Sequence, residues 1–500
     1  MRILFIYPNL YAQIGFNYGV AFLSAVLKKA GHETKLLNIN DKLGFYLDHD
    51  RIKKEVLNFD PELIAFSVVT NQYQFAKNIA SEIRKYHDAP ILCGGIHPTM
   101  DPEGVLNSGE FDFVCMGEGE GALCDLAGNI NSTEEIKKIK NIWMKDNGLI
   151  IKNPMRELVD LSTLPRKDYE IFDFQKMIDA KDGWVGLMTS RGCPFRCTYC
   201  LNHKIVKMYQ DDLQTKKINY MRCHSVEDVI SEIDFVLRNY DRIKMFIFDD
   251  DLFTFNKEYV EDFCRQYKKY FRVPFVCNAH VKVFDDSIAQ GLKDAGCQIV
   301  KFGLESGSDR VRSQIMRRFM KNEDIEKAFA SAEKAGLHSS AFVMMGLPSE
   351  SDEELQETID LLGRIKPGRF RWAIFFPFIN TEAYDITKNL GLINEEKINS
   401  LANFTEESCL NLSDQVYRKV KCMQKIFPWY VNASSNLEVA PLYKNLVEII
   451  ENLSEDEWVN IKDNLRRIDE DLSKVLDSKG CTHYRIKYNS FTGVRSDWID

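Results

Sequence analysis

At residues 189–200 the chain reads Thr189-Ser-Arg-Gly-Cys-Pro-Phe-Arg-Cys-Thr-Tyr-Cys200. Three thiols, Cys193, Cys197 and Cys200, stand in it at a C-x3-C-x2-C spacing. The apolar run 184–188 leads directly into this stretch, and such a run ending in Gly and Pro is typical of a buried strand that passes into a tight loop. Three thiolates can hold one inorganic group and leave one corner of a tetrahedral or cubane site without a protein ligand. A position left without a protein ligand can bind a cofactor or substrate, so it indicates a catalytic role.

Three interpretations of this loop compete. A zinc site needs a fourth ligand, which His203 could supply just beyond the loop. Inert core thiols are a poor explanation, because a rigid Gly-Pro loop places cysteines badly for packing. The interpretation that we favour is a [4Fe-4S] cluster with one iron left for a cofactor or substrate. The spacing, with Tyr199 before the last cysteine, resembles the signature of the radical S-adenosylmethionine (SAM) superfamily.

Composition sets limits on the class of protein. The 500 residues suggest two or three domains, and 45% hydrophobic with 28% charged residues is an ordinary globular balance. A net charge of -9 argues against nucleic acid or an anionic membrane as the main partner. No apolar run is long enough to span a bilayer, and the amino terminus is typical of a strand rather than a signal peptide. The 13 cysteines favour a reducing, cytoplasmic location.

The first 130 residues alternate strand-like and helix-like patterns. This alternation predicts a doubly wound parallel sheet of the Rossmann or flavodoxin type, in which ligands bind beyond the carboxyl ends of the strands. The predicted strands are 3–7, 34–37, 63–69, 91–94 and 111–116, and the predicted helices include 19–30 and 75–86.

The loops that follow these strands are rich in glycine and hydroxyl groups, which let a ligand approach the backbone closely. Tight turns are the plainer explanation of any single loop. Together, Gly94-Gly-Ile-His-Pro98 and Gly117-Glu-Gly-Glu120 resemble the cobalamin (B12)-binding domain that precedes many radical SAM cores. The Asp-x-His-x-x-Gly motif that supplies a cobalt ligand in other cobalamin domains is absent. The resemblance implies contacts to cobalamin from Ser67, Thr70, Gly94, Gly95, His97, Gly117, Glu118 and Gly119.

Residues 131–182 are charged and irregular and are predicted to form a connector. From 183 to 390 the pattern repeats strand and helix six times, which matches the partial (β/α)6 TIM barrel that the resemblance implies. The predicted strands are 184–190, 244–249, 274–278, 299–304, 341–346 and 371–376, and the predicted helices are 226–240, 257–270, 286–295, 309–317, 322–335 and 352–365.

Polar groups at the ends of these barrel strands are candidates for binding SAM. Asp250 and Asp251 follow the second strand and could accept hydrogen bonds from an ammonium group, although a solvated turn would look similar. The resemblance implies SAM contacts from Tyr199, Asp250, Asp251, Glu305, Ser306 and Gly346. His280, after the third strand, faces the substrate or is a buried structural histidine. The region 391–500 is predicted to be mostly helical and carries no motif that we can assign.

The resemblance implies an enzyme that holds a [4Fe-4S] cluster, SAM and cobalamin and takes electrons from an external donor such as flavodoxin or ferredoxin. The expected reaction is methylation of an unactivated carbon, or of a phosphinate phosphorus, in a small molecule through a 5′-deoxyadenosyl radical. An oxidative cyclisation or rearrangement without methyl transfer is the alternative. Methylthio transfer to RNA would need a second cluster from Cys93, Cys115 and Cys124, and a cobalamin carrier without enzymatic activity would leave the cysteine loop unexplained.

Overall fold

The structure is a computed structural model that describes residues 1–400, 407–487 and 491–498. The chain divides into two compact units. The first unit contains residues 1–194 and 201–247, and the second contains residues 195–200 and 248–500. Among the described residues, no helix is both long enough and apolar enough to cross a membrane.

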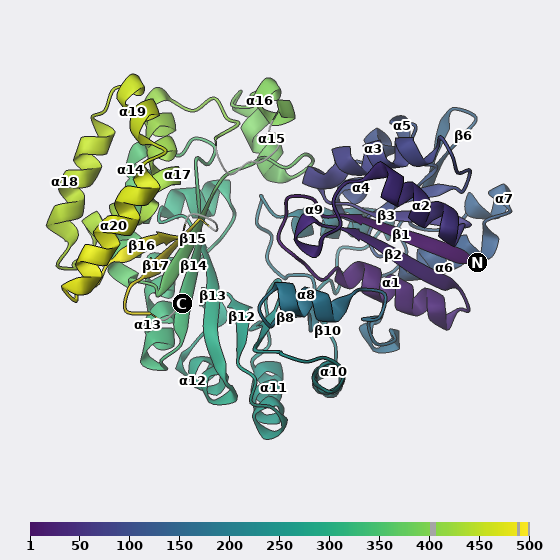
Figure 1. Ribbon diagram of the computed structural model, residues 1–500, viewed down its shortest axis with the longest axis horizontal. Coiled ribbons are helices and arrows are strands. Elements are labelled where there is room, and N and C mark those ends of the chain that lie inside the picture. Colours follow the sequence, from purple (N-terminus) through teal and green to yellow (C-terminus); the bar gives the residue numbers. More distant parts are fainter. Residues whose placement is uncertain (401–406, 488–490, 499–500) are drawn as a thin grey trace. The chain divides into compact units, whose positions relative to one another are not determined.

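The first unit is built on a seven-stranded sheet with the order β2-β1-β3-β4-β5-β6-β7 (Figure 1). The first five strands pair in parallel. Their order is that of a flavodoxin-like doubly wound sheet, so the fold predicted for the N-terminal part is confirmed. The strands are β1 (Arg2–Pro8), β2 (Glu33–Ile39), β3 (Leu63–Ser67), β4 (Ile91–Gly94), β5 (Phe113–Cys115), β6 (Ile142–Asp146) and β7 (Leu149–Lys152).

Helices cover both faces of this sheet (Figure 1). The central strands β1 and β3 are apolar along most of their length, as strands covered on both faces are. One face packs against apolar residues of α2, α3 and α5, and α1 and α6 lie together on the other. The helices are α1 (Tyr18–Lys29), α2 (His49–Phe59), α3 (Tyr73–Ile83), α4 (Ile96–Met100), α5 (Pro102–Asn107), α6 (Glu120–Asn129), α7 (Thr133–Ile136), α8 (Phe174–Ala180), α9 (Leu201–Asp212) and α10 (Val226–Asn239).

The segment predicted as an irregular connector also contributes to this sheet. Strand β6 pairs antiparallel with β5, and β7 pairs antiparallel with β6. Both strands are short and carry Lys or Asp at their ends, and β7 has no buried residue, so neither strand was recognised in the sequence. The remainder of 131–182 runs on to α8.

Helix α9 follows Cys200 directly and packs into the core of the first unit. Ile205 and Tyr209 are buried among the side chains of the seven-stranded sheet and its helices. The Tyr209 hydroxyl accepts a hydrogen bond from the backbone N–H of Glu118 (3.1 Å). Gly117 makes room for this ring, because its φ is +62° and a Cβ there would lie 2.5 Å from the Tyr209 hydroxyl. The end of β5 and the helix after the cysteine loop are therefore fitted to each other.

A cluster of largely shielded ion pairs, which we call the arginine clamp, holds the other end of the cysteine loop. It consists of Glu118, Glu120, Arg191 and Arg222. Arg191 Nη1 lies 3.2 Å from Glu118 Oε1, and Arg191 Nη2 lies 2.6 Å from Glu120 Oε1. Arg222 binds Glu118 through both of its terminal nitrogens. The clamp fixes Arg191, two residues before Cys193, to the loop after β5.

The charge of the clamp is balanced in the folded protein. Burial alone would raise the pKa of the Glu118 carboxyl, but hydrogen bonds and charges from Arg222 and Arg191 outweigh it and lower the pKa. Burial of Arg191 is likewise outweighed by Glu120 and Glu118, which raise its pKa. The Glu118 carboxylate and the Arg191 guanidinium are therefore charged near neutral pH. The backbone N–H of Val159 donates a further bond to Glu118 Oε2 (2.8 Å).

The second large sheet has the order β16-β17-β15-β14-β13-β12-β11-β8. The strands from β12 to β15 pair in parallel, and β17 is antiparallel to both β15 and β16. The six strands β8 and β11 to β15 alternate with helices along the chain, which confirms the predicted partial (β/α)6 barrel. The strands are β8 (Trp184–Leu187), β11 (Met245–Phe248), β12 (Phe275–Ala279), β13 (Cys297–Glu305), β14 (His338–Met345), β15 (Arg369–Ile374), β16 (Tyr484–Lys487) and β17 (Thr492–Arg495); β9 (Ser190–Arg191) and β10 (Arg222–Cys223) form a separate two-stranded ladder.

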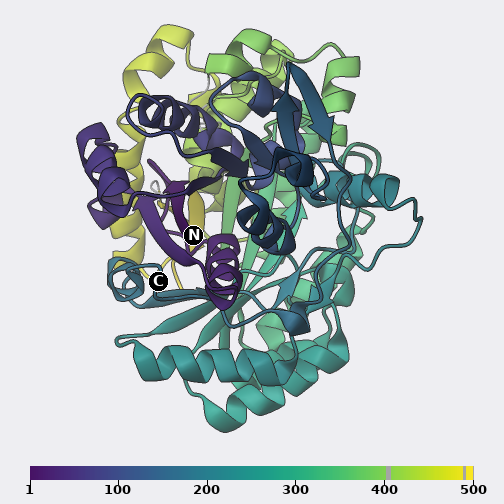
Figure 2. The same ribbon diagram turned by 90° about the vertical axis from the view of Figure 1, so that its right-hand side faces the viewer.

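The barrel helices of the second unit agree with the sequence prediction. The helix predicted over 309–317 forms over 309–315, with a π-helical turn at Val311–Ile315. Helices α11 and α12 pack side by side (Figures 1 and 2). The helices are α11 (Lys257–Tyr270), α12 (Asp286–Ala295), α13 (Asn322–Lys334), α14 (Asp352–Ile365), α15 (Glu382–Asn389), α16 (Glu395–Ser400), α17 (Asp414–Ser434), α18 (Ala440–Glu451), α19 (Glu455–Ile461) and α20 (Leu465–Ser478).

A buried carboxylate helps to join the C-terminal helices to this sheet. Asp469 on α20 accepts hydrogen bonds from the Trp429 indole (2.7 Å) and from the backbone N–H of Ile486 in β16 (3.0 Å). Burial raises the pKa of Asp469 to about 6. Helix α17 bends near Ile426, whose φ and ψ are not helical, next to Pro428. The region is therefore mostly helical, as predicted, but it also adds the β16–β17 hairpin to the edge of the sheet.

We predict that Gly117→Ala destabilises the first unit by about 2 kcal/mol, because the added Cβ meets Tyr209 at a positive φ. Gly128→Ala in α6 is the matched control, since nothing lies within 4 Å of its Cβ position. That change should be neutral or stabilising, as Ala is a better helix former than Gly. Calorimetric unfolding of the apoprotein measures both. Equal transition temperatures for the two variants would show that the fit between Gly117 and α9 is loose.

We predict that Glu118→Gln lowers stability at pH 7 by about 3 kcal/mol, because two buried guanidinium groups lose a shared charge. Glu103→Gln removes a carboxylate from an exposed pair with Lys152 and should change stability by less than about 1 kcal/mol. The pKa of Glu118 is lowered, so its stabilisation is present above the unfolded pKa and is lost as the pH falls through the folded pKa. The difference between wild type and Glu118→Gln in denaturant titrations should therefore shrink in acid.

Candidate functional site

The loop from Gly192 to Cys200 leaves β9 in a backbone conformation that needs glycine. Gly192 has a φ of +88°, and a Cβ there would lie 2.4 Å from the carbonyl oxygen of Tyr220. Cys193 follows at once. The turn at the start of the loop is therefore imposed by the adjacent segment of this chain, at Tyr220, and not by a ligand.

Within the second unit, the part of the loop that carries Cys197 and Cys200 is fixed by hydrogen bonds. The Thr198 N–H donates to the Met316 carbonyl (3.0 Å), and the Thr198 hydroxyl donates to the Ile315 carbonyl (2.6 Å). The Cys200 N–H donates to the Cys197 carbonyl (3.1 Å). The last two cysteines therefore lie on a backbone that the π-helical turn at Val311–Ile315 supports.

The three cysteines fit a [4Fe-4S] cluster in their chemistry and spacing. Such a cluster binds each thiolate to a different iron and needs no cage around a single ion. Among the residues that the structure describes, no group of three His, Cys, Asp or Glu side chains converges on one point. A positive charge also lies beside one of the sulfurs, as Arg318 Nη1 is 3.7 Å from Cys197 Sγ.

Glu305, a predicted SAM contact, stands at an irregular point of β13. The register between β13 and β14 shifts between Gly303 and Glu305, and Glu305 has a φ of +68°. A β-bulge and a left-handed residue both cost free energy and are enriched at functional sites. Burial raises the pKa of Glu305, and the charge of Arg318 and a hydrogen bond from Tyr199 lower it by less. Tyr199 and Glu305, both predicted to contact SAM, are therefore neighbours.

Gly303 makes this arrangement possible. A Cβ at Gly303 would lie 2.4 Å from Glu305 Oε1 and 2.7 Å from Arg318 Nη2. Arg318 was not identified from the sequence, although Arg317 and Arg318 stand together after a predicted helix. Only the path of the π-helical turn shows which of the two arginines points inward.

The other predicted SAM contacts have partners within the protein. The Ser306 hydroxyl is fully buried and accepts a hydrogen bond from the Ser308 N–H (3.2 Å). The Gly346 N–H donates to Glu350 Oε2 (2.8 Å), and burial raises the pKa of Glu350 to about 8. Asp250 is fully buried and its carbonyl accepts from the Asn278 amide (2.8 Å), whereas Asp251 is exposed.

His280 is a buried histidine that packs on the cysteine loop. Its ring stacks on Phe195, with centroids 3.9 Å apart and an interplanar angle of 18°. Its Nδ1 accepts a hydrogen bond from the Lys282 N–H (3.2 Å). Burial, with the nearby charges of Arg318 and Lys282, lowers the pKa of His280 to about 3. Of the two roles expected from the sequence, the structure supports the structural one.

The predicted cobalamin contacts gather at the carboxyl ends of β3, β4 and β5. Gly95 is exposed and has a φ of +104°, and a Cβ there would lie 2.8 Å from the backbone of Val68. The Ser67 hydroxyl accepts a hydrogen bond from the Asn17 amide (3.0 Å). Thr70 begins a short 3-10 turn, and Gln72 in that turn bonds the backbone of Leu10 in the loop after β1. Gln72 was missed in the sequence because nothing in its local pattern marks it.

His97 has a buried nitrogen without a partner. Its ring lies against Tyr73, with centroids 4.1 Å apart, and its backbone N–H donates to the Val68 carbonyl (3.1 Å). Nε2 forms no hydrogen bond and is shielded from solvent. Burial lowers the pKa of His97, so the ring is neutral. A polar atom left unsatisfied at the end of β4 fits a site that a polar ligand completes.

Glu118 and the two glycines beside it make their contacts within the protein. The Glu118 carboxylate is taken up by the arginine clamp, and Gly117 is occupied by the fit to Tyr209. A Cβ at Gly119 would lie 3.2 Å from Leu23. These residues hold the loop after β5 in shape.

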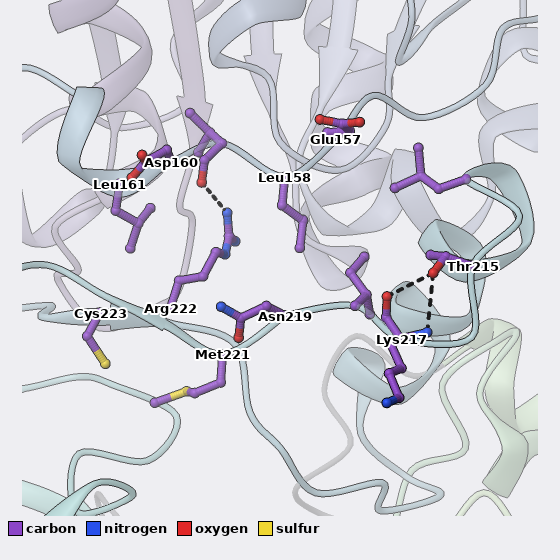
Figure 3. A pocket seen from close by; sticks show the side chains of 13 residues that line it. Glu157, Leu158, Asp160, Leu161, Thr215, Lys217, Asn219, Met221, Arg222 and Cys223 are labelled. Atoms are coloured by element: carbon purple, nitrogen blue, oxygen red, sulfur yellow. Dashed lines mark hydrogen bonds between the residues drawn. The ribbon is translucent and has the colours of Figure 1, made fainter.

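A cavity of about 580 Å³ borders the arginine clamp (Figure 3). It lies between the segment after β7 and the segment that links α9 to β10. Arg222 forms part of its wall and donates to the Val159 carbonyl (2.6 Å), as Figure 3 shows. The lining residues are Glu157, Leu158, Val159, Asp160, Leu161, Leu213, Thr215, Lys217, Ile218, Asn219, Met221, Arg222 and Cys223.

Comparisons with known proteins agree with the description of the seven-stranded sheet and with that of the barrel and its cysteine loop. Residues 10–127 match the family model of the B12 binding domain. Residues 187–362 match the model of the radical SAM superfamily. The first match contains the strand-end loops of the seven-stranded sheet, and the second contains the three cysteines and the Gly303–Glu305 bulge.

Individual relatives are similar to this chain over most of its length. An uncharacterized methyltransferase of Pyrococcus horikoshii is 28% identical over 83% of this chain and 92% of its own. An anaerobic magnesium-protoporphyrin IX monomethyl ester cyclase of Rubrivivax gelatinosus is 22% identical over 85% of this chain and 77% of its own. The radical SAM methyltransferase TsrM of Kitasatospora setae, solved with tryptophan and a SAM analogue, has a similar fold, with a TM-score of 0.64 and 17% identity over 78% of this chain and 76% of its own.

These domains bind cobalamin and, through the radical SAM core, a [4Fe-4S] cluster with SAM, which are therefore the cofactors of this chain. The family assignment rests on the order of the two domains together with the cysteine loop. The chain belongs to the radical SAM superfamily, among the cobalamin-dependent enzymes that carry an N-terminal B12-binding domain.

Proposed function

We propose that this protein is a methyltransferase that transfers a methyl group to an unactivated carbon, or to a phosphinate phosphorus, of a small molecule. One observation carries this proposal: both ends of the cysteine loop are anchored to the B12-binding domain. Arg191 enters the loop from the arginine clamp, and α9 leaves it into the core under the seven-stranded sheet. A chain built in this way keeps the start of the loop, with Cys193, in the same unit as the domain that binds the methyl carrier.

The chemistry divides between the cofactors and the protein. When bound, the cluster with SAM supplies a 5′-deoxyadenosyl radical, and cobalamin supplies a carrier for a methyl group. The protein orients these groups and excludes water. We propose that Cys193, Cys197 and Cys200 hold the cluster.

We propose that SAM is held by carboxylates at the strand ends of the barrel. Asp251 is exposed and Glu305 lies beside Tyr199, so both are placed to accept bonds from an ammonium group. Asp250, Ser306 and Gly346 are engaged within the protein and contribute the shape of the site.

For cobalamin we propose a site formed by Ser67, Thr70, Gly94, Gly95 and His97. The unsatisfied Nε2 of His97 supports a polar contact there. Gly117, Glu118 and Gly119 act indirectly by holding the neighbouring loop. No residue is assigned as a ligand of cobalt, because the Asp-x-His-x-x-Gly motif is absent.

A second candidate function is oxidative cyclisation or rearrangement without methyl transfer. The similarity to the cyclase of Rubrivivax gelatinosus, over most of both chains, supports this second candidate. Methylthio transfer would need a second cluster, and Cys93 and Cys115 are poorly placed to hold one, because both are buried within the strands β4 and β5.

The electron for SAM cleavage must come from outside the chain. We propose a low-potential donor protein of the flavodoxin or ferredoxin type, as the radical chemistry requires one electron for each cleavage. A cytoplasmic location, expected from the many cysteines, belongs to the same proposal.

The two candidate functions differ in the products of SAM. For a methyltransferase we expect S-adenosylhomocysteine and 5′-deoxyadenosine together when the protein is reconstituted with iron, sulfide and hydroxocobalamin and supplied with SAM and a reductant. S-adenosylhomocysteine should disappear when cobalamin is left out, whereas 5′-deoxyadenosine should persist. Chromatography with mass detection measures both. Formation of 5′-deoxyadenosine alone, with cobalamin bound, would favour the cyclase alternative.

Cys197→Ala should abolish the iron–sulfur absorbance and all 5′-deoxyadenosine formation, because one corner of the cluster loses its ligand. Cobalamin binding should remain, since its site lies in the first unit. Cys422→Ala is a matched control, as Cys422 is a buried thiol in α17, away from the loop in sequence. A Cys197→Ala protein that still holds a full cluster would contradict the assignment of the ligands.

A further inference from the structure

Arg318 is a buried cation next to a proposed cluster ligand. Its Nη1 lies 3.7 Å from Cys197 Sγ and 3.5 Å from the Tyr199 hydroxyl oxygen. Its Nη2 donates to the Gly303 carbonyl (2.6 Å). A guanidinium keeps its proton at any physiological pH, so Arg318 is charged.

The place of Arg318 is set by a rigid turn. The π-helical turn at Val311–Ile315 is held by Arg312, which is fully buried and donates to the carbonyls of Ser306 (2.5 Å) and Met320 (3.2 Å). The Arg318 N–H donates to the Arg312 carbonyl (2.7 Å). The absence of a side chain at Gly303 leaves the space that the guanidinium fills.

The neighbouring arginine points elsewhere. Arg317 pairs with Glu382 on α15 at 2.6 Å, and half of its side chain is exposed. The two residues have the same chemistry and adjacent positions but different surroundings. They therefore form a natural pair of test and control.

We propose that Arg318 raises the reduction potential of the [4Fe-4S] cluster through its charge and its hydrogen bond to the Cys197 sulfur. Hydrogen bonds to cluster sulfurs, net charge and solvent exposure are the levers by which a protein sets this potential. Reduction takes one electron from the external donor and makes the cluster with its thiolates more negative by one charge. A buried cation beside a thiolate stabilises the reduced form more than the oxidised form. Arg318 is thus a positioning residue, and its role rests on the proposed cluster ligands.

The test is a potentiometric titration of the reconstituted protein, followed by electron paramagnetic resonance, with SAM left out. Arg318→Gln should shift the midpoint potential to a more negative value. Arg318→Lys keeps the charge but cannot bond the Gly303 carbonyl and the Cys197 sulfur at the same time. Its midpoint potential should therefore lie between those of the wild type and Arg318→Gln. Gly303→Ala, which displaces the guanidinium without changing its charge, should also lower the potential. Arg317→Gln should leave the potential unchanged.

A wild-type potential in Arg318→Gln with full iron content would overturn the proposal. If Arg318→Gln holds no cluster, Arg318→Lys carries the test, and a wild-type potential in that variant overturns it equally. An equal shift in Arg317→Gln would also count against it, since a general effect of surface charge would then suffice. These outcomes are separate from the proposed function, which fails instead if the wild-type protein binds no cluster or forms no S-adenosylhomocysteine.

Discussion

The ion pairs between Arg191 and the two glutamates of the loop after β5 are the constraint on which the site depends. They hold the entrance of the cysteine loop, while Tyr209 of α9 holds its exit against Gly117. A loop of nine residues that is tied at both ends has little conformational freedom left. The same contacts join the two flanks of the cysteine loop to the loop after β5.

Several glycines and polar groups at the strand ends are also fixed by contacts within the protein. Gly95, Gly117 and Gly303 are glycines because protein atoms occupy the space of a Cβ, and in the last case those atoms belong to Glu305 and Arg318. The Ser306 hydroxyl and the Gly346 N–H bond neighbouring residues. Buried polar groups must find partners whether or not a ligand is present. A strand-end loop rich in glycine therefore reports close packing as readily as ligand binding.

Several charged or titratable groups lie close to Cys197 in the protein interior. A guanidinium, a carboxyl group with a raised pKa and a phenol lie together beside a thiol, and Glu305 adopts a left-handed backbone conformation to join them. Strain and burial of charge both cost stability. In barrels of this kind the active site lies at the carboxyl ends of the strands, and these groups stand at that end of β13. A role in the active site therefore best explains them.

The cysteine spacing, the alternation of strands and helices in both domains and the barrel helices followed from the sequence, because periodicity and short motifs are local properties. The helix predicted over 309–317 forms, but no local pattern shows that its turn at Val311–Ile315 is π-helical. The strands β6 and β7, the partners of Glu118 and the inward turn of Arg318 rather than Arg317 were decided only by the tertiary structure. Each depends on contacts between residues far apart in the chain, and the free energy of such contacts is not present in any local stretch of sequence.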